Sequence, residues 1–229
     1  MKLNLDPKYL ENLALRELEE DTLDMAHPED ARSSELAELE SAGSSTKLAL
    51  VVGHTNRSQG AVGVNPLDKS EYLWNDELAG IVRQIAIGRG VNCKIFYRDG
   101  IGISGAYAQV KSWGANTCVE LHFNAAETDA YGTETLHGVL DSSNELAATI
   151  QHDMLSSLSR EINHNRGIKL RVDGERGGRS LSQLTDIPSV IVEPFFGHVK
   201  PEATLGVERR LQYAEGLVRS HLRFMTSFA

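Results

Sequence analysis

The order of apolar patterns along the chain predicts an α/β fold: a mostly parallel, twisted sheet of about six strands with helices on both faces. Short apolar runs, such as Leu48–Val52 and Val190–Val192, have the length of buried strands. They alternate with longer segments whose apolar side chains recur every three or four residues, which is typical of amphipathic helices. Strands that alternate with helices favour parallel pairing, because each crossover helix then covers one face of the sheet.

Each element is expected from its own pattern. The segment 72–87 places Trp74, Leu78 and Ile81 on one face of a helix. A helix over 104–113 is expected to begin with Ser104 as its cap, and the last helix is expected to run over 204–224. The other expected elements are strands at 48–53, 92–97, 117–123, 133–139, 168–172 and 189–193, and a long helix at 144–161.

The first 46 residues differ in charge from the rest of the chain. They hold four basic and twelve acidic residues, whereas the remaining 183 residues hold 19 basic and 20 acidic ones. Short helices are expected near 7–18 and 34–40, followed by a linker at 41–46. We therefore expect an acidic N-terminal segment, 1–46, that is helical or disordered, and a main domain, 47–229. The segment either docks on this domain or on a partner, or it stays solvated.

Composition excludes several classes of function. The main domain is nearly neutral and has no basic stripe, so nucleic-acid binding has no electrostatic basis. No apolar run approaches the roughly 18 residues that a membrane span needs. The N-terminus lacks the apolar stretch of a secretory signal, which predicts synthesis in the cytoplasm. Cys93 and Cys118 lie in apolar strand contexts, and we expect buried, reduced thiols there.

Three of the expected strands run into residues that can bind metal or transfer protons. These residues are His54, His122 and Glu193. Because the carboxyl ends of parallel strands share one edge of a sheet, the three side chains should meet there. Two imidazoles and a carboxylate are the usual protein ligands of a catalytic zinc site, in which water takes the fourth position. Glu71, at the start of the first helix, is the natural third ligand. Glu193 precedes Pro194-Phe195-Phe196, and a carboxylate in such apolar surroundings is costly without a nearby cation.

These residues also lie in an ordered set of motifs. The motifs are Gly53-His54, Ser70–Asn75, Leu121–Ala125, Gly132–Glu134, Asn165–Lys169 and Pro188–Pro194. Together they resemble the catalytic domain of the zinc-dependent N-acetylmuramoyl-L-alanine amidases of type 3, which occur in bacterial cell-separation enzymes and phage endolysins. The resemblance covers about residues 47–225.

The resemblance implies a peptidoglycan hydrolase that cleaves the amide bond between N-acetylmuramic acid and L-alanine of the stem peptide. It implies Zn²⁺ held by His54, Glu71 and His122, with Glu193 as the acid/base for a zinc-activated water. The substrate would be cell wall, reached outside the cytoplasm after release or delivery by another factor. Two alternatives stay open: another zinc carboxypeptidase or amidohydrolase, and a non-catalytic wall-binding or phage structural module.

Further residues have less certain roles. Candidates for gripping the muramyl peptide are Asn124, Arg166, Lys169 and Arg179. The chain also departs from the family pattern, because Glu120 stands where a small serine is common. Strand alternation turns Glu120 to the same face as His122, so it is either a partner that orients the imidazole or an ordinary strand-end residue. Glu77 is a rival to Glu71 as the third ligand, but Glu71 fits the family's register.

Overall fold

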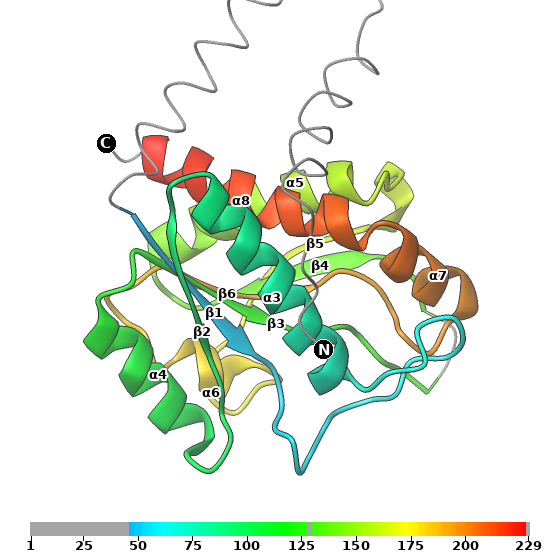
Figure 1. Ribbon diagram of the computed structural model, residues 1–229, viewed down its shortest axis with the longest axis horizontal. Coiled ribbons are helices and arrows are strands. Elements are labelled where there is room, and N and C mark those ends of the chain that lie inside the picture. The colour runs from blue at the N-terminus through cyan, green and yellow to red at the C-terminus, as the bar shows by residue number, and fades with distance from the viewer. Residues whose placement is uncertain (1–45, 128–129, 228–229) are drawn as a thin grey trace, which may run out of the picture. The chain divides into compact units, whose positions relative to one another are not determined.

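The computed structural model describes residues 46–127 and 130–227, and Figure 1 shows how their elements are arranged. The short helices expected near 7–18 and 34–40 lie outside the described residues, and the domain boundary at 46/47 stays a prediction. Among the described residues, none of the helices has the length and apolar character that crossing a bilayer requires.

Six strands, six α-helices and one 3₁₀ turn make up the described part of the chain. The strands are β1 (Lys47–Val52), β2 (Asn92–Phe96), β3 (Thr117–Leu121), β4 (Thr133–His137), β5 (Asn165–Leu170) and β6 (Ser189–Glu193). The helices are α3 (Glu71–Gly88), α4 (Gly102–Trp113), α5 (Asp141–Ser157), α6 (Gly178–Leu181), α7 (Lys200–Glu208) and α8 (Arg210–Ser227), with a 3₁₀ turn, η1 (Ile162–His164). The expected α/β fold is confirmed.

The strands form one sheet in the order β2-β1-β3-β6-β4-β5. All neighbours pair in parallel except β4 and β6, which are antiparallel. The central strands β1, β3 and β6 therefore point the same way and end at the same edge. This arrangement brings the residues that follow β1 and β3 close to the last residue of β6.

Alternate side chains of the sheet enter two separate cores. On one face, Leu48, Leu50 and Val52 pack with helices α3, α5 and α8. On the other face, Ala49 and Val51 pack with α4. In Figure 1 these helix groups lie on opposite sides of the sheet, with α6 on the side of α4. Because β1 is covered on both faces, its apolar run has no polar interruption.

Two expected helix boundaries are wrong. The helix α4 begins at Gly102 with Ile101 at its N-cap, so Ser104 lies inside the first turn and caps nothing. The helix expected over 204–224 is two helices that meet at Arg209. The two pack on different partners: Gly206 of α7 closes on Phe195, whereas α8 packs on α3 and α5. The apolar spacing of a helix does not reveal such a change of partner.

The two cysteines are free and buried, as expected. Burial raises the pKa of each thiol to about 12, so both stay protonated at neutral pH.

Candidate metal centre

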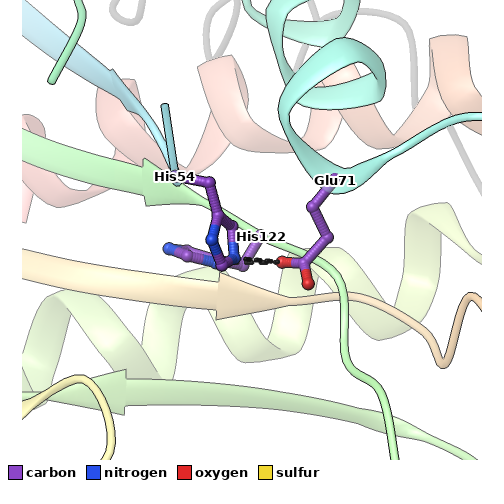
Figure 2. A group of neighbouring side chains, drawn as sticks. All are labelled: His54, Glu71 and His122. Carbon is purple, nitrogen blue, oxygen red and sulfur yellow. Dashed lines mark hydrogen bonds and ion pairs between the residues drawn. The ribbon is translucent and has the colours of Figure 1, made fainter. Parts of the chain in front are cut away.

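Three side chains from three elements meet at the edge where β1 and β3 end. His54 follows β1, His122 follows β3, and Glu71 is the first residue of α3 (Figure 2). One carboxylate oxygen of Glu71, Oε2, lies 3.1 Å from His54 Nε2 and 3.1 Å from His122 Nδ1. One ligand atom from each residue lies within 4.8 Å of the others. The structure thus brings together the three ligands expected from the sequence.

The donor set fits a zinc ion. Ligand atoms about 2.0–2.1 Å from Zn²⁺ in a tetrahedron lie roughly 3.3 Å from one another. The two nitrogen–oxygen distances of 3.1 Å are close to that separation. Two imidazoles with one carboxylate also leave a fourth position open, which distinguishes catalytic from structural zinc sites.

Two glycines allow the imidazoles to approach each other. A Cβ on Gly53 would collide with the His122 ring and with the carbonyl oxygen of Leu121. A Cβ on Gly60 would collide with the His54 ring, and Gly60 has a φ of +75°. His54 itself has a φ of 66°, which is uncommon for a residue with a side chain. This strained backbone aims the ring back toward the end of β3.

Glu71 is held in place at the start of its helix. The side chain of Ser70 caps α3, and the second carboxylate oxygen of Glu71 accepts a hydrogen bond from the backbone N–H of Ala61, at 3.1 Å. Burial alone would raise the pKa of Glu71, but the adjacent side chains of His122 and His54 lower it to about 2. The rival Glu77 instead pairs with Lys69 and Arg210. In the structure Glu71, and not Glu77, lies with the two histidines, and its role as a metal ligand stays a prediction.

Glu193 ends β6 inside the same cavity as the three ligands. Its side chain is 3% exposed, and burial raises its pKa to about 7, against the opposing effects of His122 and Arg176. One oxygen, Oε1, accepts a hydrogen bond from Arg176 at 2.8 Å. The other, Oε2, has no hydrogen-bond partner among the described residues. A buried carboxylate with a free oxygen and a pKa near neutrality can both accept and donate a proton.

The cavity has a volume of about 360 Å³ and two kinds of wall. Arg176 and Arg179 contribute positive charge, and Ile103, Leu136 and Ile191 contribute an apolar surface. The cavity therefore places charged and apolar surface beside the two histidines, Glu71 and Glu193.

The four expected substrate-binding residues fall into two groups. Arg179 lines the cavity. Asn124, Arg166 and Lys169 instead all donate hydrogen bonds to Glu134 on β4. Asn124 is 1% exposed, and its amide oxygen accepts from Arg176. The role of each residue toward substrate stays a prediction, but these three have a structural partner that the sequence did not reveal.

Glu120 faces His122, as strand alternation predicted. Its Oε1 lies 2.7 Å from His122 Nε2, the ring nitrogen that points away from Glu71. Arg98 and the hydroxyl of Tyr107 contact the same carboxylate.

Sequence reasoning missed two arginines at the site, Arg176 and Arg98. Arg176 lies in a glycine-rich stretch, 174–178, that follows an exposed strand, and nothing in its neighbourhood signals a partner 17 residues away. Arg98 follows β2, whose carboxyl end reaches the same edge of the sheet as β1. The strand-end argument that identified His54 and His122 could have found Arg98 as well.

Comparison with known proteins now decides the family. Residues 48–220 match the family model described as N-acetylmuramoyl-L-alanine amidase. The chain belongs to this family. It is therefore an amidase, and its class of substrate is peptidoglycan. No match was found among curated proteins.

Solved structures share the fold of this amidase domain. An N-acetylmuramoyl-L-alanine amidase from Clostridium difficile 630 is 20% identical, with a TM-score of 0.68 over 81% of this chain and 100% of that one. The catalytic domain of CwlV, an amidase from Bacillus (Paenibacillus) polymyxa var. colistinus, is 20% identical, with a TM-score of 0.66 over 78% of this chain and 97% of that one. The catalytic domain of the CD27L endolysin, which targets Clostridium difficile, is 22% identical, with a TM-score of 0.64 over 78% and 97%.

Proposed function

We propose that this amidase cleaves the bond between the lactyl group of N-acetylmuramic acid and L-alanine, with Zn²⁺ held by His54, Glu71 and His122 and with Glu193 as acid and base. The observation that carries the proposal is the His–Glu–His cluster, whose ligand atoms lie within 4.8 Å of one another and share a cavity with Glu193. Zn²⁺ in this position would lower the pKa of a water from 15.7 to about 7 and polarise the substrate carbonyl.

Glu193 supplies the proton transfers. Its unpartnered Oε2 takes a proton from the attacking water, and the same oxygen then delivers it to the leaving amine nitrogen. The second transfer is necessary because an amide anion is a very poor leaving group. A pKa near 7 suits one group to both steps, since neither form is then strongly favoured at neutral pH.

The arginines of the cavity wall orient the peptide. Arg179 and Arg176 both line the cavity, and a guanidinium binds a carboxylate in two-point fashion. We assign Arg179 to the anionic part of the stem peptide. Asn124, Arg166 and Lys169 donate to Glu134, and Asn124 also accepts a hydrogen bond from Arg176 of the cavity wall.

Replacing Glu193 tests its role. Glu193→Gln should bind zinc as the parent does but lose turnover by about 10²–10⁴-fold, because the amide cannot accept the proton. Glu175→Gln is the matched control, since Glu175 is an exposed loop carboxylate whose side chain accepts a hydrogen bond from the backbone of Val172. Near-full activity of Glu193→Gln would remove Glu193 from the mechanism.

Digestion of purified peptidoglycan tests the reaction itself. The protein is incubated with cell walls, with and without a chelator, and the new termini are identified by mass spectrometry. The proposal predicts free L-alanine amino termini that disappear when the chelator is present. Release of a C-terminal amino acid would instead identify a carboxypeptidase, and intact walls that retain the protein would identify a binding module.

The proposed place of action is the cell wall outside the cytoplasm. We propose that the protein reaches it by release or by delivery through another factor, as an endolysin does. The acidic residues 1–46 are proposed as the part of the chain available for docking, on a partner or on the amidase domain.

A further inference from the structure

A second buried carboxylate, Glu120, lies directly behind the proposed metal site. It is fully buried in the last part of β3, and both of its oxygens are in contact with polar groups. Oε1 faces Arg98 and His122 Nε2, and Oε2 accepts a hydrogen bond from the Tyr107 hydroxyl. Burying a carboxylate costs free energy unless such partners surround it, so the contacts with Arg98, Tyr107 and His122 are what allow Glu120 to be buried here.

The partners come from separate parts of the fold and hold Glu120 rigidly. Arg98 lies in the turn after β2, and its side chain is 10% exposed. It also donates a hydrogen bond to the hydroxyl of Ser180 in α6, at 3.0 Å. Tyr107 lies in the middle of α4 and is 1% exposed. Because a turn, two helices and a strand contribute, the carboxylate has little freedom to move.

The contact with His122 fixes the orientation of this imidazole. A neutral imidazole carries one N–H, and the hydrogen bond at one nitrogen determines which nitrogen can bind a metal. Glu120 accepts from Nε2 at 2.7 Å. The lone pair therefore remains on Nδ1, the nitrogen that lies 3.1 Å from Glu71 Oε2.

We propose that Glu120, anchored by Arg98 and Tyr107, is a positioning residue that holds His122 with Nδ1 turned toward the metal and thereby sets the affinity for zinc. This inference rests on the proposed metal site, but it goes beyond it, because none of the three residues belongs to the ligand set or to the proton-transfer machinery. Carboxylates behind a metal-bound histidine contribute about 10–100-fold to metal affinity in other proteins.

Zinc affinity measured by competition with a chromophoric chelator tests the proposal on the full chain. Glu120→Gln keeps the size of the side chain but loses the charge that holds Arg98 and His122. We expect its zinc dissociation constant to rise about 10–100-fold. With zinc added to saturation, most of the turnover should return and the KM for peptidoglycan should stay unchanged, which a general loss of structure would not produce.

The matched control is Asp153→Asn. Asp153 is also a buried acid, 1% exposed, and it pairs with Arg223 and Arg219 between α5 and α8, away from the residues of the cavity. Its zinc affinity should stay within about twofold of the parent. If Glu120→Gln does not fold, Tyr107→Phe serves instead, because it removes one anchor of Glu120 and leaves the ion pair with Arg98 in place. A severalfold weaker zinc affinity is expected for Tyr107→Phe.

The outcomes separate this inference from the proposed function. A parent protein that binds no zinc overturns both. A parent that binds zinc, with Glu120→Gln or Tyr107→Phe binding it equally well, overturns the positioning role alone. Equal weakening in Asp153→Asn also overturns it, since the effect would then belong to any buried acid of the fold.

Discussion

The ion pair between Glu202 and Arg160 stabilises the segment that carries Glu193, and breaking it should be severe. Both side chains are buried, 3% and 5% exposed, and they form two hydrogen bonds of 2.5 and 2.7 Å. Glu202 also accepts from the backbone N–H groups of Gly132 and Phe196. Arg160 in turn donates to the carbonyl of Pro194, the residue after Glu193.

Glu202→Gln should lower the free energy of unfolding by about 3–5 kcal/mol, because it leaves the Arg160 charge buried without a counter-charge. At about 2–4 °C per kcal/mol for a domain of this size, the melting temperature should fall by roughly 6–20 °C. The folded fraction should also lose turnover, because the contacts that hold the residues after Glu193 are weakened.

Urea unfolding followed by circular dichroism, with zinc removed from every sample, measures the effect. Glu77→Gln is the control: this carboxylate also has two cationic partners, Lys69 and Arg210, but its side chain is 36% exposed. Exposed pairs contribute at most about 1 kcal/mol. A Glu202→Gln variant as stable as Glu77→Gln would refute the view that the Glu202–Arg160 pair stabilises the segment after β6, the strand that ends in Glu193.

Three further predictions concern pH and metal. Burial lowers the pKa of His221 to about 4, so the free energy of unfolding should fall by about 3 kcal/mol as the pH drops from 6.5 toward 4. In urea titrations at these pH values, His221→Gln should lack this part of the acid destabilisation. Arg176 lowers the pKa of Glu193, so Arg176→Ala should move the acid limb of the kcat/KM profile upward by less than about one pH unit. An unmoved limb contradicts this, and so does an equal shift in the control Arg171→Ala, which changes a half-buried arginine of the same loop region. Zinc at about 1,000 times its dissociation constant should raise the free energy of unfolding of the parent by about 4 kcal/mol, measured by calorimetry. A similar increase in His54→Ala would remove His54 from the ligand set.

The apolar runs were sufficient to predict the class of fold and the edge at which the site forms. Strands such as β1 and β6 are covered on both faces, so their sequences are continuously apolar and the polar residue that ends each one stands out. The order of the strands and the antiparallel pairing of β4 with β6 could not be predicted, because neither changes the local pattern. The break between α7 and α8 was missed for the same reason.

Some contacts around the site follow from local sequence rules, whereas others join residues that are far apart in sequence. Glu120 was placed beside His122 because strand alternation is a local rule, and the 2.7 Å contact agrees. The partner of Arg98 on α6, Ser180, lies 82 residues away in sequence. The strand-end rule could have placed Arg98 at this edge of the sheet, but no local pattern indicates its contact with Ser180. Asn124, Arg166 and Lys169 were chosen as substrate ligands for their polarity, and only the fold reveals that they converge on Glu134.

The most direct test of the metal centre is a crystal structure of the zinc-loaded protein, with anomalous differences collected on both sides of the zinc absorption edge. We predict one peak about 2.0–2.2 Å from a nitrogen of His54, a nitrogen of His122 and an oxygen of Glu71. A zinc peak bound by other residues, or one that leaves any of these three side chains out of reach, would contradict the account.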